Sequence, residues 1–245
     1  MPSPYPARID FSQPQPPLIR DAIETQRRMA AQVTLKDDFG PIKTIAGIDV
    51  GYDLKRELTK AVVVVLDYET LELQTSVIAY AHTDFPYISG LLAFRESPTI
   101  VKALDGLREK PDLLMVDGHG IAHPRRLGIA AHLGVVTGLP SIGVAKSRLT
   151  GKHEQLIPTR GARTPLLDKG ETIGTVLCSK DKCNPLYVSA GHRISHETAL
   201  EITLRCLKTY RLPEPTRIAD QISKWRLDEK NPPPLAEDLF GKKDV

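Results

Sequence analysis

The order of the apolar segments between residues 44 and 145 is the feature that most constrains how this chain can fold. Three strand-like segments come first, and the short links between them favour antiparallel hairpins. These segments cover 44–50, 60–68 and 71–83. Helix-like and strand-like segments then alternate, over 90–108, 112–117, 125–137 and 140–145. A meander followed by strands that are joined through helices predicts an α/β fold, with one mixed sheet of antiparallel and parallel strands flanked by helices.

The remaining segments extend this architecture. The further predicted elements are a helix over 21–33, strands over 172–178 and 186–189, a helix from Ser195 to just before Pro213, and a helix over 216–227. Residues 151–170 have the character of an irregular, basic insertion. We find no linker or internal repeat, so we expect a single domain over 18–227. Six prolines in 1–17 predict a flexible N-terminal arm, and we expect a flexible tail over 228–245.

Several classes of protein are disfavoured by simple features of the chain. The longest apolar run, Ala61–Leu66, has the length of a buried strand and not of a membrane span. The N-terminus has no apolar core after a basic start, which disfavours a signal peptide. Three cysteines are too few for a disulfide framework. We therefore expect a cytoplasmic protein that does not bind a membrane.

Positive charge is concentrated in one segment. The net charge is only +3, yet residues 121–164 contain seven basic residues and a single acidic one, Glu154. We call this segment the basic stripe; its basic residues are Arg125, Arg126, Lys146, Arg148, Lys152, Arg160 and Arg163. A local basic stripe on a nearly neutral protein indicates a polyanionic partner, although a solvated surface with no partner has the same composition.

Two aspartates are expected to meet at one edge of the sheet. Asp49 lies inside the first apolar strand, and Asp117 ends the fourth. Since these strands can lie side by side and parallel, the two carboxylates would converge, and a divalent ion would relieve their repulsion. Oxygen ligands favour Mg²⁺ or Mn²⁺ over zinc. In the alternative interpretation, Asp117 merely caps the turn that follows its strand. Glu96 either faces the same edge or pairs on the surface with Arg95 or Lys102.

Three further patterns are weak. The segment 138–147 is similar to a phosphate-binding loop, but Gly143 and Lys146 are separated by two residues. His119 and His123 have helical spacing within a stretch broken by glycine and proline, so they do not predict a zinc site. The cysteines are better explained as small buried apolar residues. Nucleoside triphosphate and zinc sites are therefore disfavoured.

With these residues assembled, the chain resembles the endonuclease V family, deoxyinosine 3′-endonucleases with a ribonuclease-H-like fold. The resemblance runs from about residue 20 to residue 225, in family order and at family spacing. The matching motifs are IAGIDVGYD (45–53), FPYISGLLAFRE (85–96), DLLMVDGHGIAHPRRLGIAAHLG (112–134), PSIGVAKSRLTG (140–151) and LPEPTRIAD (212–220). Two positions depart from the usual pattern: Ser89 replaces a proline of the motif around Tyr87, and His119 replaces glutamine or asparagine.

The resemblance implies roles for individual residues. Asp49 and Asp117 match the two metal-ligand aspartates, with Mg²⁺ as the cofactor and Mn²⁺ as its substitute. Glu96 matches a third acidic catalytic residue, and Lys146 a lysine near the scissile phosphate. Tyr87 matches the tip of a wedge inserted beside the lesion. The positions that match the pocket for the extruded base are Gly90, Leu92, Gly118, Gly120, His123, Ile129 and Leu149. The candidate phosphate contacts are Arg125, Arg126, Arg148 and Lys152.

Asp220, in the last motif, stands where family members have histidine or aspartate. We expect a fourth catalytic acidic group there, or else a surface aspartate paired with Lys224 one helical turn away.

The resemblance implies a metal-dependent DNA repair endonuclease that acts as a monomer on damaged DNA containing deoxyinosine. The expected reaction is hydrolysis of the second phosphodiester bond 3′ to the lesion, leaving a 3′-hydroxyl and a 5′-phosphate. Two alternatives stay open: an endoribonuclease specific for inosine in RNA, and a binding module that recognises inosine or nucleic acid without cleaving it. The intact set of Asp49, Glu96, Asp117 and Lys146 favours cleavage.

Overall fold

The structure, a computed structural model, describes residues 17–53 and 56–225. The predicted tail over 228–245 and all but Pro17 of the predicted arm lie outside these described residues. The helices are α1 (Pro17–Ala30), α2 (Leu92–Asp105), α3 (Ile129–Thr137), α4 (His196–Arg205) and α5 (Glu214–Ser223). The strands are β1 (Thr44–Asp53), β2 (Leu58–Asp67), β3 (Leu73–His82), β4 (Leu113–Val116), β5 (Ser141–Ala145), β6 (Arg163–Asp168), β7 (Glu171–Leu177) and β8 (Leu186–His192).

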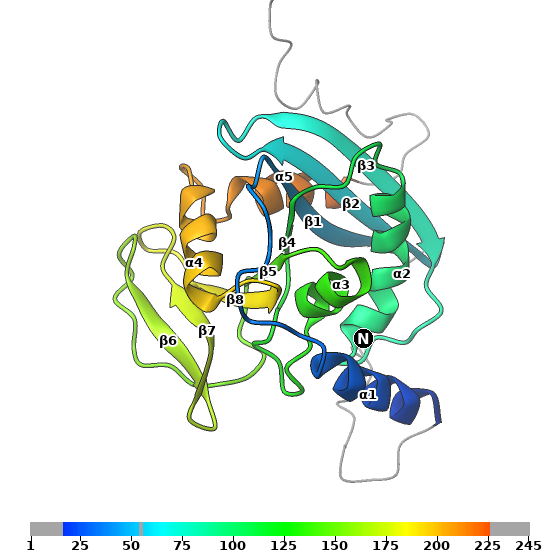
Figure 1. The fold of residues 1–245 in the computed structure, drawn as a ribbon, viewed down its shortest axis with the longest axis horizontal. Coiled ribbons are helices and arrows are strands. Elements are labelled where there is room, and N and C mark those ends of the chain that lie inside the picture. The colour runs from blue at the N-terminus through cyan, green and yellow to red at the C-terminus, as the bar shows by residue number, and fades with distance from the viewer. Residues whose placement is uncertain (1–16, 54–55, 226–245) are drawn as a thin grey trace, which may run out of the picture.

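The eight strands form one mixed sheet in the order β3-β2-β1-β4-β5-β8-β7-β6 (Figure 1). The first three strands pair antiparallel, and β4 runs parallel to both β1 and β5. Ile48 is in register with Val116, and the amide of Asp117 donates to the Ile48 carbonyl at 2.9 Å. The sheet therefore confirms the predicted neighbourhood of β1 and β4, and it has the ribonuclease-H-like arrangement that the family resemblance implied.

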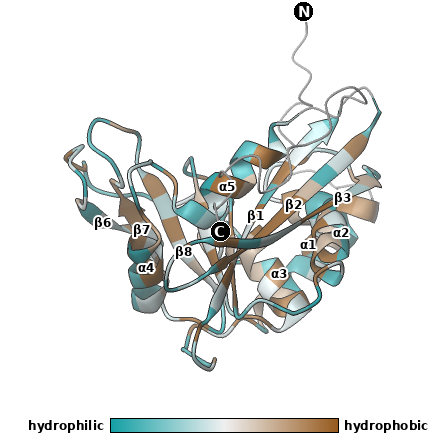
Figure 2. Cartoon of the chain, turned by 90° about the horizontal axis from the view of Figure 1, so that it is seen from above, coloured by the Kyte–Doolittle hydropathy of each residue, from teal (hydrophilic) through white to brown (hydrophobic). Residues whose placement is uncertain are grey.

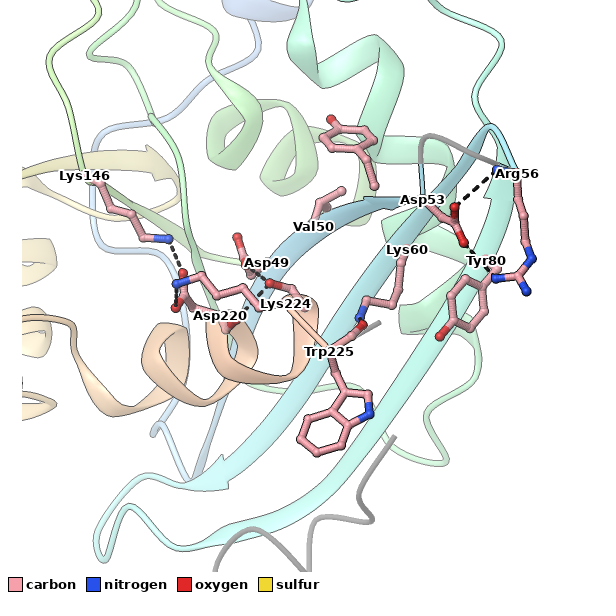
Figure 3. A pocket seen from close by; sticks show the side chains of 13 residues that line it. Asp49, Val50, Asp53, Arg56, Lys60, Tyr80, Lys146, Asp220, Lys224 and Trp225 are labelled. Carbon is pink, nitrogen blue, oxygen red and sulfur yellow. Dashed lines mark hydrogen bonds and ion pairs between the residues drawn. The ribbon is translucent and has the colours of Figure 1, made fainter. Parts of the chain in front are cut away.

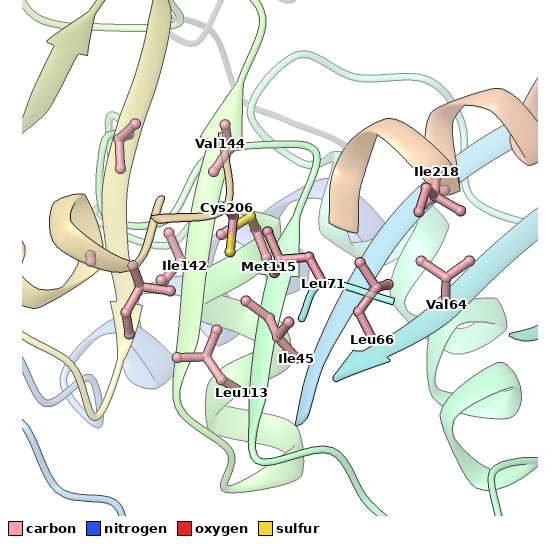
Figure 4. Packing of buried hydrophobic residues seen from close by; sticks show 14 of the residues in the cluster. Ile45, Val64, Leu66, Leu71, Leu113, Met115, Ile142, Val144, Cys206 and Ile218 are labelled. Carbon is pink, nitrogen blue, oxygen red and sulfur yellow. The ribbon is translucent and has the colours of Figure 1, made fainter. Parts of the chain in front are cut away.

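Side chains alternate between the two faces of the sheet, and helices cover both. Ile45, Met115 and Ile142 pack with Ile218 of α5 on one face, where Figure 4 shows the close packing of these apolar side chains. On the other face, strand residues pack with α2 and α3. Figure 2 shows apolar residues concentrated on the strands and polar residues on the outer sides of the helices. Strands β2, β4 and β5 are thus buried on both sides, as the near-continuous apolar run of β2 requires.

Helix α5 lies unusually close to β1, because two glycines of the strand leave room for it. A Cβ built on Gly47 would collide with the carbonyl of Pro215, and one built on Gly51 with the carbonyl of Ser223. These two residues lie at opposite ends of α5, so the whole helix rests on the backbone of β1. This contact fixes the position of every α5 side chain that faces the end of the strand.

Some element boundaries differ from those predicted. Helix α3 begins at Ile129 instead of residue 125, because residues 123–128 form turns in which Arg126 has a φ of +56°. The helix after Ser195 ends at Arg205, well before Pro213, and α5 begins at Glu214.

The segment 151–170 was wrongly predicted to be wholly irregular. It contains β6, which forms a hairpin with β7 through Lys169 and Gly170, both at positive φ. Two residues at positive φ are typical of the tight turns that join hairpin strands. Among the residues described, no helix is long and apolar enough to cross a membrane.

Candidate active site

Three carboxylates converge where β1, β4 and α5 meet. Asp49 lies in β1, Asp117 directly follows β4, and Asp220 lies in α5. One carboxylate oxygen from each of the three lies within 4.8 Å of the other two. The meeting of Asp49 and Asp117 follows from the parallel pairing of their strands, as the sequence predicted. Asp220 joins them because α5 rests on β1, and it also forms the predicted ion pair with Lys224, at 2.6 Å. We call these three aspartates the acidic cluster.

The environment of the acidic cluster favours a bound cation. Burial, and then the charge of Asp117, raise the pKa of Asp49 to about 7. Burial also raises the pKa of Asp117, against the opposing effect of Lys146. A divalent ion would remove this cost, and a set of buried carboxylate oxygens without sulfur or nitrogen suits Mg²⁺ or Mn²⁺. The donor set therefore fits the metal that the family resemblance implied, and the cluster could hold it.

Lys146 lies against the acidic cluster. Its ammonium group forms ion pairs with Asp117 and Asp220. Burial alone would lower the pKa of Lys146, but the neighbouring carboxylates outweigh it and raise that pKa. Burial would likewise raise the pKa of Asp220, yet hydrogen bonds from Lys146 and Lys224 lower it. Lys146 is thus held as a cation, and Asp220 as an anion, at the acidic cluster.

Glu96 points into the protein from α2 and is only 7% exposed. Its carboxylate accepts a hydrogen bond from the Tyr52 hydroxyl, and burial raises its pKa to about 8. The surface pairings with Arg95 and Lys102 are not formed: Arg95 stacks over the Tyr52 ring and donates to the Phe85 carbonyl, while Lys102 donates to the Tyr80 carbonyl. The charges of Asp49 and Asp117 reach Glu96 and also raise its pKa. Its carboxylate is not among the three that converge, so Glu96 lies beside the acidic cluster and not within it.

The sequence analysis missed three residues that position the site. Tyr52 holds Glu96, as described above. The Ser223 hydroxyl donates to Asp49, and the Lys60 ammonium donates to the carbonyls of Ile222, at 2.8 Å, and Trp225. Lys60 thereby ties the C-terminal end of α5 to β2. A charged residue inside an apolar strand is a signal that could have identified Lys60, just as it identified Asp49.

A small pocket lies on one side of the acidic cluster, with a volume of about 210 Å³. Asp117 forms part of its wall, so the pocket and the acidic cluster share a residue. The lining includes most of the residues that the resemblance assigned to a base pocket or wedge: Tyr87, Gly90, Leu92, Gly118, His123, Ile129 and Leu149. Gln26, His119 and Arg148 also line it. The Tyr87 side chain is 40% exposed at this pocket.

Gly120 does not line the small pocket. A Cβ on Gly120 would collide with the carbonyl of Ala190, and its amide donates to the Ser189 hydroxyl at 2.9 Å. Its carbonyl accepts from the amide of Gly128 at 2.8 Å. Gly120 therefore packs the loop after β4 against β8, because no larger residue fits between the two backbones. Its part in shaping the pocket is indirect.

Two of the four residues predicted to contact phosphates already bind other groups of the protein. Arg125 donates to the Gly90 carbonyl at 2.7 Å and also to Gln26, so it ties the loop of Tyr87 to α1. Arg126 forms ion pairs at 2.9 Å with Asp168 and at 2.8 Å with Glu171, both at the β6–β7 turn. Arg148 and Lys152, in contrast, are exposed.

A large pocket of about 800 Å³ also opens beside the acidic cluster (Figure 3). Asp49, Asp220 and Lys146 form one end of its lining, and Arg56 and Tyr80 belong to the other. The acidic cluster therefore borders two pockets, of which the sequence analysis anticipated only the small one.

Comparisons with known proteins point to one family. The family model described as Endonuclease V matches residues 27–221. An endonuclease V from Rippkaea orientalis is 50% identical over 208 residues, which cover 85% of this chain and 91% of the relative. The crystal structure of endonuclease V from Streptomyces avermitilis is 41% identical, with a TM-score of 0.79, and the match covers 89% of this chain and 95% of that one.

A third similar protein was solved with nucleic acid. Endonuclease V from Ciona intestinalis, in complex with a 24mer DNA containing an inosine followed by a ribo-adenosine, is 31% identical with a TM-score of 0.74. The match covers 84% of this chain and 96% of that one.

Proposed function

Because this chain belongs to the endonuclease V family and is therefore a nuclease, we propose that it cleaves DNA next to deoxyinosine. The bond hydrolysed is the second phosphodiester on the 3′ side of the lesion, and the products carry a 3′-hydroxyl and a 5′-phosphate. The observation that carries the proposal is that Asp117 belongs both to the acidic cluster and to the small pocket. A base held in that pocket would place nearby phosphates of its own strand at the acidic cluster.

Asp49 and Asp117, with Asp220 beside them, would hold Mg²⁺, for which Mn²⁺ would substitute. When bound, the ion supplies Lewis-acid stabilisation of the charge on the phosphate and on the leaving 3′ oxygen. Lys146 adds a positive charge that is already in place before the reaction, which is the most effective form of electrostatic stabilisation. Ser223 keeps Asp49 oriented through its hydrogen bond. Glu96, held by Tyr52, would act through water from beside the acidic cluster.

The small pocket would receive the extruded base. Flipping a base out of a duplex costs a few kcal/mol, and less for a mispaired base such as hypoxanthine. The backbone near Gly118 offers donors and acceptors that can distinguish the carbonyl of hypoxanthine from the amino groups of adenine and guanine. Tyr87 would occupy the vacated space or stack on a neighbouring base. Arg148 and Lys152 remain the best candidates for contacts to the phosphates, since both are exposed.

The alternative substrate is inosine in RNA. The Ciona intestinalis enzyme was solved with an inosine followed by a ribonucleotide, which favours keeping this candidate. A protein distinguishes RNA from DNA through its contacts to 2′-hydroxyl groups. In either case we expect the protein to act as a monomer in the cytoplasm.

A cleavage assay with matched duplexes tests the proposal. The substrates are 5′-labelled DNA and RNA duplexes with one inosine at a defined position, together with the same duplexes containing adenosine. In Mg²⁺ we expect one cut in the inosine DNA, at the second phosphodiester 3′ to the lesion, and no cut in EDTA. A polymerase should extend the labelled product, because it ends in a 3′-hydroxyl.

Other results would replace the proposal. Cleavage of the inosine RNA alone would identify an endoribonuclease. Selective binding of the inosine duplexes without cleavage in Mg²⁺ or Mn²⁺ would identify a binding module.

A further inference from the structure

Catalytic residues Asp49, Asp220 and Lys146 line one end of the large pocket, but the function proposed above gives no role to the rest of it. The small pocket meets the acidic cluster through a different residue, Asp117. A strand whose base is held in the small pocket and whose phosphate lies at the acidic cluster must continue beyond that cluster. The large pocket is the cavity that it would meet there. Its volume of about 800 Å³ lies in the upper part of the range of about 300–1,000 Å³ for ligand sites.

The floor of the large pocket is a row of residues that face one another across three strands. Gly51 of β1 is in register with Lys60 of β2, and Lys60 with Tyr80 of β3, so all three share one face of the sheet. Helix α5 ends above this row, where Lys60 donates to the carbonyls of Ile222 and Trp225. Figure 3 shows Lys60 between Tyr80 and Trp225. The floor is therefore rigid, since buried hydrogen bonds join it to the helix that carries Asp220.

Two aromatic side chains and two cations border this floor. The Trp225 side chain is 39% exposed, and the Tyr80 ring is half-buried. Arg56 pairs with Asp53 at 2.9 Å and Lys224 with Asp220 at 2.6 Å, but their side chains are 50% and 70% exposed. Their carboxylate partners are much less exposed, at 23% for Asp53 and 9% for Asp220, so each cation keeps its partner and turns its outer side to solvent, where a phosphate can contact it. Aromatic faces interleaved with exposed cations are the chemistry that binds single-stranded nucleic acid.

We propose that the large pocket binds the nucleotides that follow the cleaved bond on its 3′ side, with bases stacked on both Trp225 and Tyr80. This inference rests on the proposed function, because the direction of the strand follows from a lesion in the small pocket and a cut on its 3′ side. The pocket then holds the cleaved strand on both sides of the scissile phosphate. It also binds the 5′-phosphorylated product until that product is released.

The first test uses fluorescence, because Trp225 is the only tryptophan of the chain. The probe is a 5′-phosphorylated DNA tetranucleotide without inosine, added to the full chain in Mg²⁺. We expect it to quench the Trp225 emission in a saturable way, and Tyr80→Ala to weaken its binding by roughly five- to 150-fold. Tyr210→Ala is the matched control, since Tyr210 is an exposed aromatic residue that lines neither pocket. No quenching, or equal effects of the two substitutions, would overturn the proposal.

The second test measures cleavage of inosine-containing strands that differ only in the number of nucleotides 3′ to the cut. For the wild type, kcat/KM should rise as these nucleotides are added and then level off. Trp225→Ala should flatten this dependence by about five- to 150-fold, and Trp225→Phe should largely restore it, because the stacking face returns. An identical length dependence in wild type and Trp225→Ala would overturn the subsite.

Failure of the proposed function has a different signature in these tests. In that case the wild type cleaves no inosine strand of any length, while the tetranucleotide still quenches Trp225. The large pocket would then stand as a nucleic-acid site that does not serve this reaction.

Discussion

In the metal-free protein, the change of the unfolding free energy with pH should come in large part from Glu96, and the substitution Glu96→Gln tests this. Burial raises the pKa of Glu96 from 4.5 to about 8 in the folded protein, whereas the unfolded chain keeps the ordinary value. Below pH 4.5 the carboxyl group is protonated in both states and folding carries no penalty. Between pH 4.5 and 8 the unfolded state loses its proton first, so the stability of the folded state must fall as the pH rises.

The magnitude follows from the same two values. A shift from 4.5 to about 8 corresponds to about 5 kcal/mol, at roughly 1.4 kcal/mol for each pH unit. Across this pH window the unfolding free energy of the wild type should therefore fall by several kcal/mol more than that of Glu96→Gln. Glutamine has nearly the same shape, stays neutral, and can still accept the hydrogen bond from Tyr52. Asp49, with a pKa raised to about 7, adds to the pH dependence of both proteins, so the difference between them isolates Glu96.

The assay is urea unfolding in EDTA at a series of pH values from 5 to 9, followed by far-ultraviolet circular dichroism. We expect Glu96→Gln to gain stability over the wild type as the pH rises, with the difference levelling off above pH 8. Adding Mg²⁺ should stabilise the wild type more at high pH than at low pH, because the metal ligands must be deprotonated. If the unfolding free energies of the two metal-free proteins change with pH in parallel, the argument that burial disfavours the charged form of Glu96 is refuted.

Three further predictions follow from particular contacts. Tyr87→Ala should reduce the selection of inosine duplex over normal duplex by roughly five- to 150-fold, while Tyr87→Phe loses little; equal selection by folded Tyr87→Ala would remove the wedge role. The double substitution Arg148→Ala and Lys152→Ala should reduce the slope of log binding constant against log salt concentration by about 1.8 for duplex DNA. Arg126→Ala should leave this slope nearly unchanged, because Arg126 is paired with Asp168 and Glu171. Gly47→Ala should lower the free energy of unfolding by about 1–3 kcal/mol, because the added Cβ collides with the carbonyl of Pro215. Gly40→Ala is the control and should cost little, since nothing lies within 4 Å of its Cβ. Similar losses in the two variants, measured by thermal or urea unfolding, would contradict the close packing of α5.

The sequence predicted the part of the site that depends on the order of the strands. Three β-branched segments followed by alternating helices and strands make β1 and β4 neighbours, and this alone brings Asp49 to Asp117. Helical spacing also indicated that Asp220 could pair with Lys224, as the alternative to a catalytic role; the pair is formed, but Asp220 is buried and not on the surface. These features could be predicted from the sequence because they depend only on local periodicity and on which strands are neighbours.

Other features depend on contacts between distant segments, which periodicity does not reveal. Nothing local shows that α5 rests on Gly47 and Gly51, so the approach of Asp220 and Ser223 to Asp49 could not be derived from the strands. The partners of Arg126 in the basic stripe were missed for a related reason. Since 151–170 was predicted to be irregular, nothing in the sequence indicated the hairpin that brings Asp168 and Glu171 to Arg126.

The central claim is that Asp49 and Asp117 hold the metal ion used for cleavage beside the small pocket. The most direct measurement is Mn²⁺ binding to the wild type, Asp49→Asn and Asp117→Asn, followed by the electron paramagnetic resonance signal of the free ion, with single-turnover cleavage of an inosine duplex by the same samples. Tyr210→Ala serves as the folded control. We predict that each aspartate variant loses most of its Mn²⁺ affinity and its cleavage together, while the control keeps both. Wild-type Mn²⁺ affinity in Asp117→Asn, or wild-type cleavage by either aspartate variant at saturating Mn²⁺, would contradict this account.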